Sequence, residues 1–265
     1  MKISLLPFLC AFWAADAFVL IAPESSWKSW TDDAALERAK GFTKEIKNQF
    51  STRIIGGGSA PPARYPYYTL VEIKVNTGDT YICSASLIWE DVLLTAAHCV
   101  VDILGGGFTI DNVQAFVGLE RQDLRDDAQN RQVGVSVPHP AYKAGSEVND
   151  IMLLKLDIPV TTIAPVKLNF DAAVPADGAG VDVFGFGATS TDPNATLPTI
   201  LQKVSLSVVP YSDCNDVNSF NGAINQTVMM CAGTAAGGKV SYIYRFVNHD
   251  TIGCQLDSDA CCHCC

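Results

Sequence analysis

Short runs of β-favouring residues, separated by turn residues, recur along the chain from Ile54 onward. Val, Ile, Tyr and Phe are frequent in the runs at 68–75, 81–88, Val113–Val117, 151–156 and 181–186. Gly, Asn and Asp fill intervening segments at 76–79, 104–107 and 176–178. Regularly spaced short strands with turn signals are typical of a β-sandwich or a β-barrel. The pattern therefore predicts an all-β domain that begins near Ile54.

The N-terminal segment has a different pattern. Lys2 precedes an almost wholly apolar run at 3–19, and Ala15-Asp16-Ala17 forms an A-x-A pattern. A positive start, an apolar centre and a small-residue cleavage site are typical of a secretory signal. A buried strand or a membrane anchor is the alternative. We interpret residues 1–17 as a signal peptide, which predicts a secreted, extracellular protein.

Residues 18–53 separate this signal from the β-rich region. Thr31 or Asp32 can cap a helix whose apolar positions recur at helical spacing, at Leu36, Ala39, Phe42, Ile46 and Phe50. A short amphipathic helix between a signal and a domain is typical of a propeptide, and we interpret residues 18–53 in this way. An ordinary first helix of the domain remains the alternative.

Composition narrows the classes of partner and compartment. The net charge is −10, which disfavours nucleic acid as a partner because nucleic-acid binding needs a basic face. After the signal no apolar run is long enough to span a membrane, so no membrane association is expected once the signal is removed. The chain has ten cysteines, which become disulfide candidates in an oxidising compartment. Asn194 and Asn225 begin glycosylation sequons.

Four ordered blocks carry the most specific information. V-L-L-T-A-A-H-C ends at His98-Cys99, and R-I-I-G-G begins at Arg53. N-D-I-M-L-L-K-L contains Asp150, and M-M-C-A-G contains Cys231. Together with the G-F-G segment at 185–187, these blocks resemble the chymotrypsin/trypsin-like serine protease family (peptidase S1) over residues 53–239.

The resemblance implies a fold and two site residues. The implied fold is two six-stranded antiparallel barrels with the site in the cleft between them. His98 matches the general base of the family, which takes a proton from a serine hydroxyl and returns it to the leaving amine. Asp150 matches the carboxylate that orients the imidazole, although a capping Asp at a strand start is the alternative. Disulfides are implied between Cys83 and Cys99 and between Cys214 and Cys231.

The resemblance also implies an activation step at Arg53–Ile54. Cleavage there by a trypsin-like protease would release an Ile54 ammonium that pairs with the Asp preceding the catalytic serine. A plain Arg-Ile junction is the alternative.

The nucleophile segment departs from the family. The family motif is C-Q-G-D-S-G-G-P, and the nearest match begins at Cys254 and reads C-Q-L-D-S-D-A. Asp257 and Ser258 are therefore the only candidates for ammonium partner and nucleophile, and chance similarity is the alternative. Leu256 replaces the glycine whose main-chain N–H donates to the oxyanion. A strained or positive-φ backbone at this position would disfavour the branched side chain of leucine. Ile252 lies where the family has the floor of its specificity pocket, so no cleavage specificity is predicted.

The C-terminal region matches the family poorly over 240–265. Only seven residues follow Ser258, so the domain at 54–265 is expected to have an incomplete second barrel. Val240-Ser241 can be encoded by a splice-donor consensus, which suggests that a mis-spliced or truncated gene model ends the chain. Cysteines 261, 262, 264 and 265 are paired as neighbours, a spacing that fits zinc poorly, so we expect no metal site.

These observations predict a secreted serine-type endopeptidase zymogen that hydrolyses protein or peptide substrates through an acyl-enzyme, without a cofactor. Its expected partners are substrates, an activating trypsin-like protease and protease inhibitors. The alternative from another class is a catalytically inactive homologue that acts as a secreted binding or decoy module.

Overall fold

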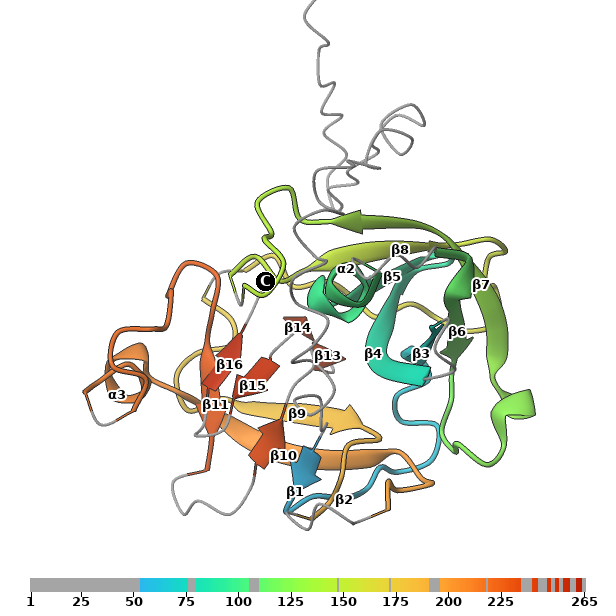
Figure 1. The fold of residues 1–265 in the computed structure, drawn as a ribbon. Coiled ribbons are helices and arrows are strands. Elements are labelled where there is room, and N and C mark those ends of the chain that lie inside the picture. Colours follow the sequence, from blue (N-terminus) through green and yellow to red (C-terminus); the bar gives the residue numbers. More distant parts are fainter. Residues whose placement is uncertain are drawn as a thin grey trace, which may run out of the picture. The chain divides into compact units, whose positions relative to one another are not determined.

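The strand pattern is confirmed in the computed structural model (Figure 1). The structure describes residues 53–75, 80–104, 110–146, 148–171, 173–190, 196–217, 219–234, 240–242, 247–248, 251–252, 255–257 and 261–263, all of which belong to the unit Asp32–Cys265. The signal, the helix expected at 32–50 and the turn at 76–79 lie outside the described residues. The turn at 176–178 is present, with Gly178 at a φ of 78° that glycine adopts without a steric penalty.

A closed antiparallel barrel forms the first half of the described chain, and its strand order is β3-β4-β5-β8-β7-β6. The strands are β3 (Tyr68–Lys74), β4 (Thr80–Trp89), β5 (Val92–Thr95), β6 (Val113–Val117), β7 (Gln129–Pro138) and β8 (Met152–Leu156). The helix α2 (His98–Leu104) follows β5, and the short 3₁₀ helices η3 (Ile110–Asn112) and η4 (Arg125–Asp127) flank β6. Because the sheet closes on itself, the barrel exposes no unpaired strand edge.

The second half is a partial sheet. Its strands β2 (Gly58–Ser59), β10 (Gln202–Val209) and β11 (Cys231–Gly233) are joined in the order β11-β10-β2, and β9 (Gly180–Gly185) also pairs with β10. The helix α3 (Tyr211–Cys214) lies between β10 and β11 in the chain. This arrangement agrees with the expectation of an incomplete second barrel.

Short strand pairs complete the described residues. β1 (Arg53–Ile55) pairs with β12 (Val240–Tyr242), so the start of the domain lies beside a segment almost 190 residues later in the chain. The other two pairs join β13 (Val247–Asn248) to β14 (Thr251–Ile252) and β15 (Gln255–Asp257) to β16 (Cys261–His263).

Aromatic packing connects the barrel core to the second sheet. Tyr65, which is 2% exposed, stacks on Phe184 of β9 with ring centroids 4.2 Å apart. Tyr68 of β3 meets Phe184 and Phe186 edge to face. The Tyr65 hydroxyl donates a hydrogen bond of 3.0 Å to Asp182. Phe184 and Phe186 belong to the same buried cluster as the barrel interior, so the barrel core extends to one face of β9, whereas Val181 and Val183 of β9 pack in a separate cluster with residues of β10.

Candidate active site

His98 and Asp150 are brought together by the pairing of β5 with β8. In this ladder Thr95, the last residue of β5, lies opposite Met152, the first residue of β8. His98 is three residues beyond Thr95, and Asp150 is two residues before Met152. Because the strands are antiparallel, the chain leaves β5 and enters β8 at the same end of the barrel. Two residues that are 52 positions apart in the sequence therefore become neighbours.

The backbone on each side of the pair is tightly held. Ala96 and Ala97 are 1% and 0% exposed, so only small residues fit between β5 and His98. Asn149 has a φ of 59°, in the left-handed region that Asn tolerates better than most non-glycine residues. This turn at Asn149 directly precedes Asp150. Asn149 was not among the predicted site residues, although an Asn directly before a candidate Asp is a usable signal for such a turn.

Asp150 accepts two hydrogen bonds from His98. Its Oδ1 accepts the main-chain N–H of His98 at 2.8 Å, and its Oδ2 lies 2.7 Å from the ring Nδ1. A carboxylate can only accept, so the proton of the second bond is carried by Nδ1. The two bonds fix both the position of the carboxylate and the tautomer of the ring. In the neutral imidazole, Nε2 is then the nitrogen with the basic lone pair.

Both side chains are shielded from water. The Asp150 side chain is 1% exposed and that of His98 is 10% exposed. A buried carboxylate is costly unless hydrogen bonds or an opposite charge compensate for the lost hydration, and His98 supplies two donors. When the imidazole gains a proton, the buried carboxylate stabilises the positive ring. The pair can therefore accept a proton from a neighbouring group and return it.

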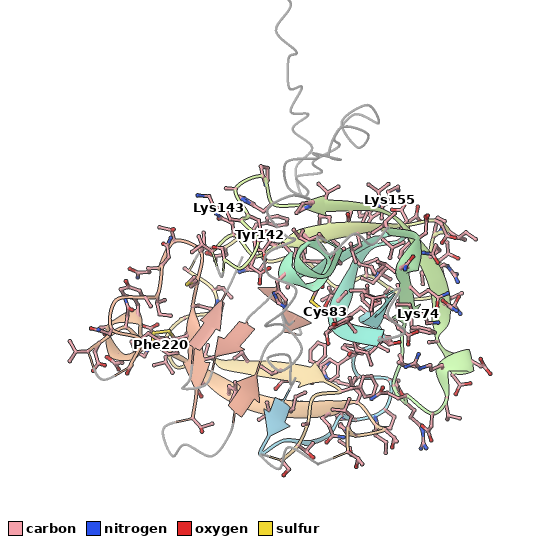
Figure 2. All side chains as sticks on the ribbon, in the orientation of Figure 1. Lys74, Cys83, Tyr142, Lys143, Lys155 and Phe220 are labelled. Atoms are coloured by element: carbon pink, nitrogen blue, oxygen red, sulfur yellow. A yellow bond between two sulfur atoms is a disulfide. The ribbon has the colours of Figure 1, made fainter. Side chains whose placement is uncertain are left out.

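Two further contacts hold the helix that begins with His98. Cys99 is disulfide-bonded to Cys83 of β4, with Cα atoms 6.1 Å apart, as the resemblance implies. Figure 2 labels Cys83, and the yellow bond beside the label is this link between β4 and α2. The Thr95 hydroxyl donates to the Ser84 carbonyl at 2.8 Å, which holds the end of β5 to the same strand. Cys99 Sγ lies 3.6 Å from His98 Nε2, and this sulfur has no proton to donate because it is in a disulfide.

The described residues do not place the remaining candidates of the catalytic segment relative to His98 and Asp150. Ser258 lies outside the described residues. Asp257 is the last residue of β15, where its main chain lies opposite Cys261, and Ile252 pairs with Val247. Leu256 lies opposite Cys262 in the same ladder.

Other predicted residues are placed more clearly. Arg53 and Ile54 are consecutive residues of β1, and Cys214 is bonded to Cys231. Asn225 is exposed, and its Oδ1 accepts the N–H of Thr227 at 3.1 Å and the Thr227 hydroxyl at 2.7 Å. Asn194 lies outside the described residues.

No group of three or more metal-binding side chains occurs among the residues that the structure describes. None of their helices is long and apolar enough to cross a membrane.

Comparisons with known proteins agree with this architecture. The family model described as Trypsin matches residues 54–242. Human Granzyme H is 32% identical over 186 residues, which cover 68% of this chain and 69% of that protein. Trypsin delta of Drosophila melanogaster is 26% identical over 192 residues, with 72% and 70% coverage. Human Kallikrein-5 is 30% identical over 192 residues, with 71% and 59% coverage.

A solved chain described as "Structure of GrC" has the same fold. It superposes with a TM-score of 0.65 and is 23% identical, covering 79% of this chain and 94% of that one. At this identity the likeness establishes the fold, which is chymotrypsin-like. The chain belongs to the trypsin family of serine proteases, because the family model covers more than half of it. Proteins are the substrates that this family implies.

Proposed function

We propose that this chain is a secreted serine-type endopeptidase, made as a zymogen, in which His98 is the general base and Asp150 is its orienting partner. The observation that carries this proposal is the buried double hydrogen bond between the two residues. An Nδ1–H held on a carboxylate leaves Nε2 as the basic nitrogen, which is the state required to take a proton from a nucleophile.

The proposed reaction proceeds through an acyl-enzyme. The Ser258 oxygen attacks the substrate carbonyl carbon while His98 Nε2 takes the hydroxyl proton. The tetrahedral intermediate collapses, the bond to the leaving amine breaks, and His98 returns the proton to that amine. Water then attacks the acyl-enzyme with His98 again as base, which releases the acid product and restores Ser258. Asp150 stabilises the charged imidazole in both halves and stays ionised.

Activation by cleavage at Arg53–Ile54 is part of the same proposal. An activating trypsin-like protease would free the Ile54 ammonium, for which Asp257 is the proposed partner. The family model begins at residue 54, which is consistent with a mature domain that starts there. We also propose that residues 1–17 are a signal peptide and residues 18–53 a propeptide, both of which precede the mature domain. Protein substrates and protease inhibitors are the proposed partners of the mature domain.

Asn225 is the better supported of the two proposed glycosylation sites. It is exposed, and the Thr227 hydroxyl is hydrogen-bonded to its amide oxygen. Both features are compatible with an attached glycan in a secreted protein. A loss of mass on glycosidase treatment that disappears in N225Q would support the site, and an unchanged mass would oppose it.

A fluorophosphonate probe tests the catalytic proposal. The chain secreted from eukaryotic cells would be cleaved at Arg53 with added trypsin, purified, and treated with the probe. We expect labelling of the wild type and none of the variants S258A and H98A. A wild-type protein that is folded and cleaved but unlabelled would instead support a non-catalytic binding module. The specific observation favouring that second candidate is Leu256, which replaces the glycine of the oxyanion segment.

A further inference from the structure

A small hollow lies where three segments of the described chain meet, and we call it the joint pocket. Its volume is about 150 Å³. It is lined by residues of the loop at 60–65, by Glu120 and Arg121 after β6, and by Ile200 and Leu201 before β10. None of these residues takes part in the proposed reaction, so the joint pocket needs an explanation of its own.

Hydrogen bonds between the three segments hold the walls of the joint pocket. The Ala60 N–H donates to the Leu201 carbonyl at 2.7 Å, and the Leu201 N–H donates to the Glu120 carbonyl at 2.9 Å. The Ala63 N–H also donates to the carboxylate of Glu120. A site whose walls are already connected loses little conformational freedom when a ligand enters. The joint pocket is therefore preformed.

The lining of the joint pocket is mostly apolar. Ala60, Pro61, Pro62, Ile200 and Leu201 contribute apolar side chains, and the two prolines have no N–H to donate. Ile200 is 37% exposed, so its side chain is accessible to an approaching protein. An apolar cavity of about 150 Å³ in another protein binds benzene. The joint pocket can therefore take a group of that size, such as the ring of phenylalanine or the side chain of leucine.

Glu120 places a negative charge beside this apolar lining. Its carboxylate accepts one main-chain N–H, and no lysine or arginine among the described residues forms an ion pair with it. Arg121 is already bound to Asp123 by two hydrogen bonds of 3.0 and 2.6 Å. Arg64, the cation of the loop, lies over the Tyr65 ring, 5.6 Å from its centroid. A ligand with a positive group next to its apolar group therefore complements the joint pocket, and the net charge of −10 favours its approach.

The joint pocket lies at the opposite end of the barrel from His98. Strands β3 and β5 run in the same direction, because each is antiparallel to β4. The loop at 60–65 precedes β3, whereas His98 follows β5. Thr69 near the start of β3 lies opposite Val117 at the end of β6, so Glu120 is at the same end as the loop. In Figure 1 β2, which leads into this loop, lies below α2. The joint pocket is thus separate from the proposed catalytic pair.

We propose that the joint pocket is a second binding site for a protein partner, which inserts a side chain the size of phenylalanine or leucine and pairs an adjacent lysine or arginine with Glu120. The apolar group leaves water, and the positive group meets a carboxylate that has no described cation. A protein segment carries both groups on neighbouring residues, and the exposed Leu124 and Leu197 in the adjoining segments offer a partner further apolar surface. This inference goes beyond the proposed reaction and does not require Ser258.

Calorimetric titration of the folded full chain with short peptides in low salt tests this site. The probe is acetyl-Gly-Phe-Lys-Gly-amide, and two comparison peptides carry Ala in place of Phe or Glu in place of Lys. For the wild type we expect a dissociation constant of about 1 mM for the probe. Loss of the ring should weaken binding about tenfold, and reversal of the charge should weaken it about threefold. Absence of binding up to about 10 mM probe would overturn the proposal.

The variants E120Q and E90Q make a matched pair for the same titrations. Glutamine keeps an acceptor for the Ala63 N–H but has no charge, and Glu90 is an exposed residue directly after β4. E120Q should bind the lysine and glutamate peptides equally and still prefer phenylalanine over alanine, whereas E90Q should behave as the wild type.

A preference for lysine that persists in E120Q would also overturn the proposal, because the peptide would then bind elsewhere, for example in the cleft beside His98. No step of the titration uses Ser258. Failure of fluorophosphonate labelling would therefore count against the proposed protease reaction and leave the result for the joint pocket unaffected.

Discussion

Asp150 contacts His98 at both its backbone and its ring, through oxygen atoms 2.8 Å from the main-chain nitrogen and 2.7 Å from Nδ1. The backbone bond fixes the carboxylate to the start of α2, and the ring bond then fixes the imidazole to the carboxylate. Neither contact alone would determine both position and tautomer. The orientation of the proposed base is therefore built into the β5–β8 end of the barrel.

The substitution D150N should abolish most of the activity without unfolding the protein. An amide has nearly the same shape as a carboxylate, but its nitrogen donates and would favour the wrong tautomer of His98. For the activated chain, kcat/KM should fall about 10⁴-fold, the size of this change in a Ser–His–Asp triad. The matched control is D157N, because Asp157 is an exposed residue directly after β8 and should be dispensable. Activity of D150N within tenfold of the wild type would contradict the proposed role.

The disulfide Cys83–Cys99 should matter for both stability and activity, whereas Cys214–Cys231 should matter mainly for stability. The paired cysteines are separated by 16 and 17 residues, so the chain-entropy model predicts a similar loss of about 3 kcal/mol for each. Urea unfolding of the double alanine variants measures that loss. Only removal of Cys83–Cys99 should also lower kcat/KM, because it releases the helix that carries His98. Equal activities in the two double variants would oppose this reasoning.

Glu72 should contribute stability that disappears in acid. Its side chain on β3 is 6% exposed and is bonded to Arg125 and, at 3.2 Å, to Lys74. Burial tends to raise the pKa of Glu72, but the hydrogen bonds from Arg125 and Lys74 outweigh it and lower that pKa below its ordinary value. The unfolded chain therefore binds this proton at higher pH than the folded chain does. The stabilisation is complete above the ordinary glutamate pKa and is lost as the pH falls through the lowered value.

Urea unfolding of the wild type and E72Q over a series of pH values tests this sign. At neutral pH E72Q should be less stable by about 1–3 kcal/mol, because a hydrogen bond between charged groups is weakened. The difference should shrink as the pH falls below the ordinary glutamate pKa. A difference that stays constant through the acid range would show that Glu72 has no lowered pKa.

The Tyr65 hydroxyl should contribute less to stability than the Tyr65 ring. Y65F removes only the 3.0 Å hydrogen bond to Asp182, whose carboxylate keeps Lys203 at 2.8 Å and Ser205 at 2.7 Å. We expect a loss of about 1 kcal/mol. Y65A also removes the ring stacked on Phe184 and should cost about 3–5 kcal/mol. Equal losses in thermal or urea unfolding would mean that the ring does not join the two sheets.

The strands of the barrel could be predicted from local patterns, but its charged contacts could not. The run at 68–75 corresponds to β3, yet Thr69 and Glu72 are as buried as its apolar residues. No local pattern indicates that Glu72 is covered, because its partner Arg125 is 53 residues away in the sequence. Long-range pairing of this kind is a property of the assembled fold.

The candidate site was predictable in part and for a particular reason. His98 and Asp150 were singled out because their flanking blocks resemble a family, whereas neither residue alone indicates a partner 52 positions away. Their contact depends on the register between Thr95 and Met152, which hydrophobic patterning leaves undetermined. The 3% exposure of Ile54 was not predicted, because the resemblance implies insertion of this residue only once the Arg53–Ile54 bond is cut.

The most direct test of the central claim is to map the residue that carries the fluorophosphonate. The chain is cleaved after Arg53, labelled and digested, and tandem mass spectrometry locates the added phosphonyl group. We predict modification of Ser258 alone, with no modification when His98 is replaced by alanine. A label on any other residue, or a folded and cleaved protein with no label at all, would contradict the claim that His98 and Asp150 serve Ser258 as a working protease.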